Sequence, residues 1–176
     1  GSCFPKDTSA ITRIAKQCGY TFKIVESVIE VNHHQRQVML DKIKGVMGNL
    51  SGKTIAALGL TFKPNTDDIR ESPAIEVIKM LIREGAKVKA YDPVGIENTK
   101  AVLPDVIYFS DEYEAAVGSD ALVVLTEWNQ FRKLDMERIK GLLKTPKVID
   151  LRNIYDPSHM KDLGFEYVCV GRAAKV

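Results

Sequence analysis

Residues 54–91 read TIAALGLTFKPNTDDIRESPAIEVIKMLIREGAKVKAY and contain two short apolar segments, Thr54–Leu58 and Lys87–Tyr91. Between these segments, Ala74–Glu84 carries apolar side chains at helical spacing, so the stretch is predicted to form a strand, a helix and a second strand. This order is typical of a parallel sheet with helices packed on its faces. Ligands of such sheets bind beyond the carboxyl ends of the strands, so the loop after Leu58 is the first candidate site.

The alternation of strands and helices continues toward the C-terminus. Four more short apolar segments are candidate strands, namely Val106–Phe109, Ala121–Leu125, Lys147–Asp150 and Tyr167–Val170. Helical patterns lie between most of them, at Ile96–Val102, Glu112–Ala116 and Met136–Leu143. The fold class predicted for residues 51–176 is therefore α/β, a doubly wound, Rossmann-like domain with a parallel sheet.

Residues 1–50 are predicted to form a helical segment outside the sheet. Apolar residues recur at helical spacing from Thr8, and Gly19 separates a first helix from a long second one that extends from Phe22 to about Gly48. The middle of the long helix, Asn32–Gln37, is polar on all sides, which suits a helix that links two domains or lies in a subunit interface. We expect this helix to mediate a homodimer; a solvated surface helix is the alternative.

The composition is that of an ordinary globular protein. Of the 176 residues, 45% are hydrophobic and 27% are charged, and the 25 Lys and Arg residues are interspersed with 23 Asp and Glu residues. Because the charges form no basic stripe, nucleic acid and anionic membranes are not expected as partners. No apolar run approaches the roughly 18 residues that span a bilayer and no secretion signal opens the sequence, so the expected location is cytoplasmic.

Three cysteines, Cys3, Cys18 and Cys169, are widely separated in the sequence. Their odd number and their spacing favour neither a disulfide framework nor a metal site, so no metal is expected. Cys18 and Cys169 lie among apolar neighbours and are predicted to be small core residues.

The loop after the first predicted strand, Gly59–Pro73, differs from a dinucleotide-binding turn. It contains one glycine, whereas pyrophosphate needs several glycines to approach the backbone. Asp92 ends the second predicted strand, where a ribose-binding acid would stand, but without the glycines this signal is weak. The domain is therefore not expected to hold NAD by itself.

The same loop offers groups that suit another phosphorylated ligand. Lys63 and Arg70 are fixed cations, Phe62 is a stacking surface, and Ser72 with Pro73 starts a helix whose free N–H groups favour an anion. In the alternative interpretation, the two cations only pair with the nearby carboxylates Asp67, Asp68 and Glu71.

The first seven residues, GSCFPKD, contain a candidate nucleophile. Cys3 lies near the predicted start of a helix and close to Lys6, and both features favour the thiolate that a cysteine nucleophile requires. Asp7 could orient or deprotonate a water molecule. The alternative interpretation is a disordered terminus that carries a cloning scar.

Two segments together resemble the UDP-glucose/GDP-mannose dehydrogenase family. They are GSCFPKD at residues 1–7 and GLTFKPNTDDIRESPA at residues 59–74. The similarity continues in the family's order through YDP at 91–93, LTEW at 125–128 and DLRN at 150–153, and so covers nearly the whole sequence.

The resemblance implies a two-step oxidation of the sugar C6 alcohol that uses two NAD and passes through a thiohemiacetal and a thioester. Cys3 matches the family's nucleophile, and Asp7 matches the residue that assists the hydrolytic water. Residues matched to ligands are Phe62, Lys63 and Arg152 for the UDP-sugar, and Lys6 and Arg70 for NAD.

The family's NAD-binding Rossmann domain, and the lysine and asparagine that support its oxyanion, do not occur in this sequence. We therefore expect this chain to bind part of the UDP-sugar without turning it over. The loop and the Glu127-Trp128 pair look more like the glucose branch of the family. The alternatives are a noncatalytic UDP-binding and dimerisation module, or the same chemistry on UDP-N-acetylmannosamine or GDP-mannose.

Overall fold

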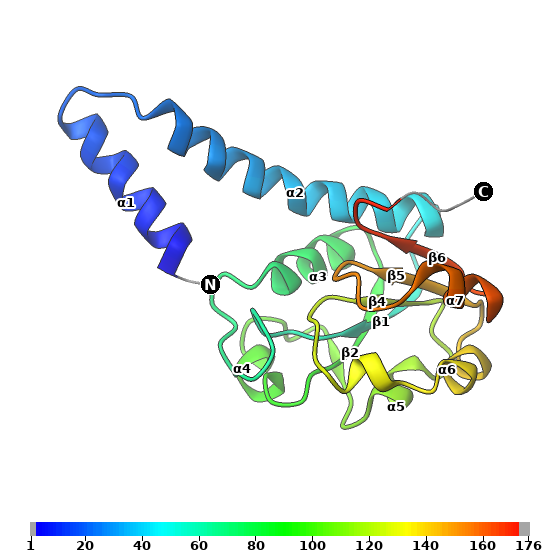
Figure 1. The fold of residues 1–176 in the computed structure, drawn as a ribbon. Coiled ribbons are helices and arrows are strands. Elements are labelled where there is room, and N and C mark those ends of the chain that lie inside the picture. The colour runs from blue at the N-terminus through cyan, green and yellow to red at the C-terminus, as the bar shows by residue number, and fades with distance from the viewer. Residues whose placement is uncertain (1–2, 173–176) are drawn as a thin grey trace.

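The computed structural model describes residues 3–172, except for the side chain of Cys3, and contains a six-stranded sheet (Figure 1). All neighbouring strands are parallel, in the order β3-β2-β1-β4-β5-β6. The strands are β1 (Thr54–Leu58), β2 (Lys87–Tyr91), β3 (Ile107–Tyr108), β4 (Ala121–Val124), β5 (Lys147–Asp150) and β6 (Glu166–Cys169). The predicted α/β fold class is confirmed, and each predicted strand agrees to within one residue at each end.

Most helices also coincide with the predicted helical patterns. They are α1 (Cys3–Gln17), α2 (Lys23–Met47), α3 (Pro73–Arg83), α4 (Ile96–Lys100), α5 (Glu112–Ala116), α6 (Met136–Leu142) and α7 (Pro157–Asp162), with a 3-10 turn, η1, at Phe131–Lys133. Helix α7 is too short to show periodicity, and the sequence analysis does not predict it. A local signal is nevertheless present, because Asp156 caps the helix by accepting a hydrogen bond from His159 N at 2.8 Å and Pro157 occupies the first turn.

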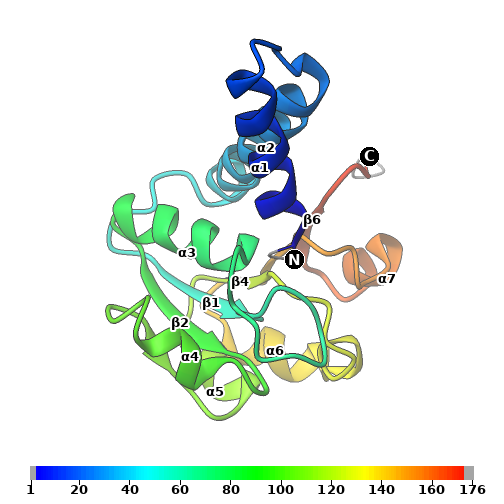
Figure 2. The same cartoon turned by 90° about the vertical axis from the view of Figure 1, so that its left-hand side faces the viewer.

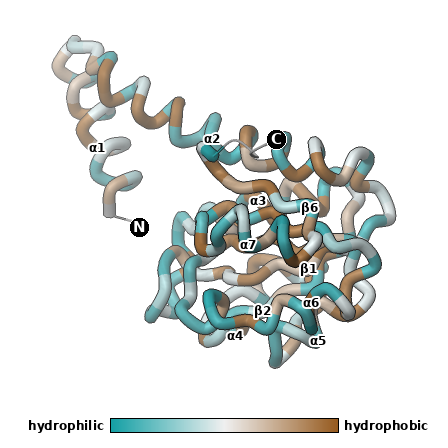
Figure 3. The backbone as a smooth tube through the Cα atoms, turned by 45° about the vertical axis from the view of Figure 1, so that its right-hand side comes forward, coloured by the Kyte–Doolittle hydropathy of each residue, from teal (hydrophilic) through white to brown (hydrophobic). Residues whose placement is uncertain are grey.

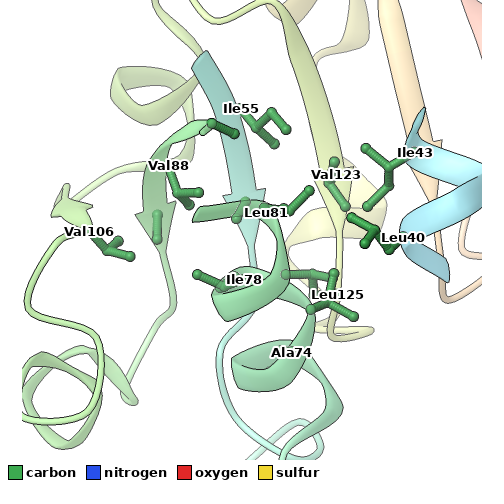
Figure 4. Close-up of a cluster of buried hydrophobic side chains, with 14 of the residues drawn as sticks. Leu40, Ile43, Ile55, Ala74, Ile78, Leu81, Val88, Val106, Val123 and Leu125 are labelled. Carbon is green, nitrogen blue, oxygen red and sulfur yellow. The ribbon is translucent and has the colours of Figure 1, made fainter. Parts of the chain in front are cut away.

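One face of the sheet is covered by α3 and by the C-terminal half of α2 (Figure 4). In α3 the buried side chains recur at the spacing of one helix face: Ala74, Ile75, Val77, Ile78 and Leu81. Leu40 and Ile43 of α2 belong to the same hydrophobic core. Helix α2 is therefore anchored to the sheet domain by its C-terminal half, where all its buried residues lie.

The other face of the sheet packs against a second core. Its fully buried members include Phe131 of η1, Ile139 of α6 and Met160 of α7. Because helices cover both faces, β4 is buried along its whole length. The result is the doubly wound arrangement in which ligand sites lie at the edge of the sheet rather than on its faces.

The N-terminal half of α2 projects beyond the sheet domain, and α1 folds back from its end (Figures 1 and 2). An ion pair of 3.0 Å between Lys16 and Glu26 joins the two helices. The hairpin returns the start of α1 to the region of α3. Apolar positions recur along the projecting part of α2 (Figure 3), where Ile24, Val28 and Val31 are exposed.

The two described cysteine side chains differ in their surroundings. Cys169 is buried at the end of β6, which confirms its predicted place in the core. Cys18 is exposed, so the prediction of a core residue was wrong there. It lies in the turn after α1, at the far tip of the hairpin, where neighbouring apolar residues in the sequence have no sheet to pack against.

Candidate functional site

The strand order reverses at the centre of the sheet, where β1 pairs with both β2 and β4. The loops that leave β1 and β4, at residues 59–72 and from residue 125, therefore begin side by side at the carboxyl edge. Such a topological switch point is where doubly wound sheets bind ligands.

The first contact between these loops is made at Gly59. Its φ is +94°, and a Cβ atom placed there would lie 2.4 Å from Thr126 Cβ and 2.6 Å from Thr126 N. Thr126 Oγ1 in turn donates a hydrogen bond to Thr61 O at 2.8 Å. Position 59 therefore requires glycine for both its backbone conformation and its close packing.

The carboxylate of Asp92, buried at the end of β2, fixes both loops. Among the described residues, six groups donate to it: Leu60 N (2.7 Å), Thr61 N (3.2 Å), Thr61 Oγ1 (3.2 Å), Val94 N (3.0 Å), Gly95 N (2.7 Å) and Trp128 Nε1 (3.2 Å). Asp92 thus ties the segments after β1, β2 and β4 to one another. Its oxygens are occupied within the protein and are not presented to a ribose.

The loop after β1 holds its cations in different ways. Arg70 forms a two-point contact with Asp68, through Nε to Oδ1 and Nη2 to Oδ2, both at 2.9 Å. The hydrogen bond from Arg70 lowers the pKa of Asp68 to about 2. Arg70 is therefore paired with a carboxylate of its own loop, whereas exposed Lys63 has no carboxylate partner in the part of the chain that the structure describes.

A cavity of about 990 Å³ lies between the start of α1, the middle of α2 and this loop. It brings Lys6 of α1 together with Phe62 and Arg70, which the sequence separates by more than fifty residues. The polar residues that α2 contributes are Asn32, His33 and Arg36. The structure thus places both predicted NAD contacts and one predicted sugar-nucleotide contact around one space.

A second cavity of about 230 Å³ adjoins the first at the carboxyl edge of the sheet. Asn32, Arg36 and Pro73 line both cavities, so the two lie on either side of these residues. The second cavity also contains Arg152, together with the apolar side chains of Leu125 and Leu151. A ligand that extends through both spaces would pass between α2 and the start of α3.

Arg152 is held in place from two sides. Its backbone N donates to Asp150 Oδ1 at 2.9 Å, and its Nε donates to Glu127 Oε2 at 2.5 Å. Burial alone would raise the pKa of Glu127, but the hydrogen bond and the charge of Arg152 outweigh burial and lower that pKa below its ordinary value. The ion pair with Glu127 uses Nε and fixes the orientation of the guanidinium. The N–H groups on the two terminal nitrogens of Arg152 can then bind a ligand.

The predicted nucleophile stands at the start of α1, but its side chain lies outside the described part of the structure. Asp7 is exposed and lies 3.8 Å from Lys6, without lining either cavity. The roles of Cys3 and Asp7 therefore stay predictions.

Sequence reasoning missed three polar residues around the site. Asn32 and Arg36 were assigned only to a polar stretch of helix, and Glu127 only to a family motif. For Asn32 and Arg36 the sequence did contain a signal, namely a polar stretch in the middle of a helix that is apolar at both ends.

Neither a membrane span nor a metal centre is found in residues 3–172. None of the helices there is both long and apolar enough to cross a bilayer. Those residues also contain no group of three or more His, Cys, Asp or Glu side chains that could hold a metal ion.

Family models match two parts of the chain. Residues 56–157 match the UDP binding domain of the UDP-glucose/GDP-mannose dehydrogenase family, and residues 1–34 match the central domain of the same family. The first match contains the loops after β1, β2 and β4. The second contains α1 and α2 as far as His34, so Arg36 lies between the two matches.

Curated relatives and a solved structure agree with these matches. The chain is 46% identical over 175 residues to a UDP-glucose 6-dehydrogenase of Bacillus subtilis and 47% identical over 173 residues to one of Rhizobium meliloti. These matches cover 99% and 98% of the chain but 38% and 40% of the relatives, so the chain spans about two-fifths of their length. A UDP-glucose dehydrogenase structure from Pyrobaculum islandicum superposes with a TM-score of 0.77 at 36% identity, covering 85% of this chain and 33% of that one.

Proposed function

Because the chain belongs to the UDP-glucose/GDP-mannose dehydrogenase family, we propose that it forms the UDP-sugar-binding part of an NAD-dependent UDP-glucose 6-dehydrogenase. The larger cavity is the observation that supports this most directly. There the helix that begins with Cys3 faces the loop after β1, so the matched nucleophile segment and the matched nucleotide-sugar loop share one space. The activity is that of the whole protein, to which this chain contributes part of the site.

In the proposed reaction, the C6 alcohol of UDP-glucose is oxidised in two steps to a carboxylate. NAD, when bound, would supply the hydride acceptor for both oxidations. The thiolate of Cys3 attacks the aldehyde carbon produced by the first oxidation, and the second oxidation converts this adduct to a thioester. Water, assisted by Asp7, then hydrolyses the thioester, which releases UDP-glucuronate and returns the thiol.

The residues of this chain fit a secondary contact with NAD rather than its main site. The loop after β1 has a single glycine, Gly59, and so provides no glycine-rich turn for the pyrophosphate. We assign Lys6 and Arg70 to NAD because both line the larger cavity and both are cationic. The main NAD site would then belong to another part of the protein.

The UDP-sugar is assigned to Phe62, Lys63 and Arg152. Phe62 lines the larger cavity and Arg152 the smaller one, whereas Lys63 lines neither and is an exposed cation of the loop after β1. Glucose is proposed as the sugar because the loop sequence and the named relatives point to it. UDP-N-acetylmannosamine and GDP-mannose are the alternative substrates, and a cytoplasmic location stays a prediction from the sequence.

Calorimetry with UDP tests this assignment on the chain itself. We expect Lys63→Ala to weaken UDP binding about ten-fold or more, since a charge-assisted hydrogen bond contributes roughly 1.5 to 3 kcal/mol. Arg70→Ala should have a smaller effect, because Asp68 already neutralises Arg70 and its proposed partner is NAD. Lys87→Ala, at the opposite edge of the sheet, is the matched control. Small and equal effects of both loop variants would contradict the assignment, as would tight binding of NAD without any binding of UDP.

We also propose that α2 mediates a homodimer. Ile24, Val28 and Val31 are exposed at spacings of four and three residues, and so form an apolar stripe on one face of the projecting half of α2. Replacing Ile24 and Val31 together by Glu should convert a dimer into a monomer in sedimentation velocity, because two charges would have to be buried in the interface. Val117→Glu, at an exposed apolar position outside α2, should leave the dimer intact. A wild-type chain that stays monomeric at high concentration would refute this part of the proposal.

A further inference from the structure

Arg36 lies in the middle of α2, on the boundary between the two cavities. Its Nη1 is 3.1 Å from His33 Nδ1, one turn earlier in the helix. Its Nε is buried and, within the described residues, has no hydrogen-bond partner. A buried donor without a partner costs free energy and is rare in native proteins, so this position calls for an acceptor.

The charge of Arg36 also lacks compensation. The other cationic side chains that line the two cavities each have a carboxylate neighbour: Lys6 with Asp7, Arg70 with Asp68, and Arg152 with Glu127. The ring nitrogen of His33 that faces Arg36 has to accept the hydrogen bond, so it carries no proton and offers no negative charge. Among residues 3–172, Arg36 forms no ion pair; Glu71 lines the larger cavity but is not within ion-pair distance of Arg36.

The location of Arg36 indicates which anion would balance that charge. Arg36 is among the few residues that line both cavities, with Phe62 and Arg70 on one side and Arg152 on the other. A nucleoside diphosphate sugar is an extended molecule whose diphosphate lies between the base and the sugar. A ligand that spans both cavities would bring its central phosphates past Arg36.

We infer that Arg36 is a further binding residue of this site, and that its guanidinium binds the diphosphate of the nucleotide sugar. Guanidinium groups suit this role because their planar N–H groups match pairs of phosphate oxygens. The inference rests on the proposed function, since it takes its ligand from there. It adds a contact from the helix that links the two matched domains, so the ligand would join α2 to the loop after β1.

A variant that removes the charge of Arg36 but keeps a long polar side chain tests this inference on the complete chain. Arg36→Gln should weaken binding of UDP about ten-fold or more, as loss of a charge-assisted hydrogen bond requires, and should leave binding of uridine unchanged. Arg83→Gln, an equal change of charge on the exposed last turn of α3, should alter neither affinity. Because Arg36→Gln also removes an unsatisfied buried donor, its melting temperature should stay level or rise.

Arg36→Lys separates binding from folding. It keeps the positive charge and should retain part of the affinity for UDP that Arg36→Gln loses. Equal UDP affinity of the wild type and Arg36→Gln would overturn the inference and leave the proposed function intact. The inference would also be overturned if both variants had lowered melting temperatures and bound UDP equally poorly. That result would show that Arg36 has a structural role. If the wild-type chain itself binds no UDP, the proposed function fails and this inference fails with it.

Discussion

Cys3→Ala should abolish formation of UDP-glucuronate by the whole enzyme while UDP-glucose binding stays nearly unchanged. Without the thiol there is no covalent adduct from which the second hydride can leave, and no thioester for water to hydrolyse. Loss of a catalytic nucleophile lowers the rate of the chemical reaction by on the order of a thousand-fold or more. The readouts are the rate of acid formation and the dissociation constant for UDP-glucose.

Cys18→Ala is the matched control, because Cys18 is an exposed cysteine at the far tip of the same helical hairpin. It should leave the rate of acid formation unchanged. Cys3→Ser provides a second test. Its hydroxyl attacks poorly and forms an ester that hydrolyses slowly, so mass spectrometry should detect a covalent adduct on the protein. Acid formation by Cys3→Ala at the wild-type rate would disprove the nucleophile assignment and favour a noncatalytic UDP-binding module.

Gly59→Ala should destabilise the domain severely, with folding lost or the free energy of unfolding lowered by about 3 kcal/mol or more. Two effects add at this position. A side chain strains the backbone at a φ of +94°, and its Cβ would meet the backbone of Thr126 at 2.6 Å, where no flexible atom can yield. Urea denaturation followed by circular dichroism measures the change.

Gly118→Ala separates the two effects. Gly118 also has a positive φ, of +64°, but a Cβ there would have no atom within 4 Å. This variant should cost only the conformational strain, about 1 to 2 kcal/mol. If both alanine variants lose the same stability, the close contact between the loops after β1 and β4 contributes nothing to the fold.

The fold could be predicted because its signals are local. The strand Thr54–Leu58 is apolar and buried after its first residue, since helices cover both faces of the sheet. In Lys87–Tyr91 the buried Val88 and Ala90 alternate with more exposed residues. The long helix was predicted from its periodicity and from Gly19, which has a positive φ in the structure. Short elements carried too few residues for a periodic signal, and so α7 was missed.

The sequence by itself determined the residue types at the site, and only the tertiary structure decided how they combine. Lys63 and Arg70 are both exposed in the same loop, yet the loop conformation pairs Arg70 with Asp68 and gives Lys63 no carboxylate partner among the described residues. Asp92 binds amides about thirty residues away, and Arg152 meets Glu127 across the sheet edge. Arg36 approaches the site because α2 is anchored by residues such as Leu40 and Ile43 one or two turns further along. Periodicity describes neighbours along the chain, whereas hydrogen bonds and charges act between atoms that only packing brings together.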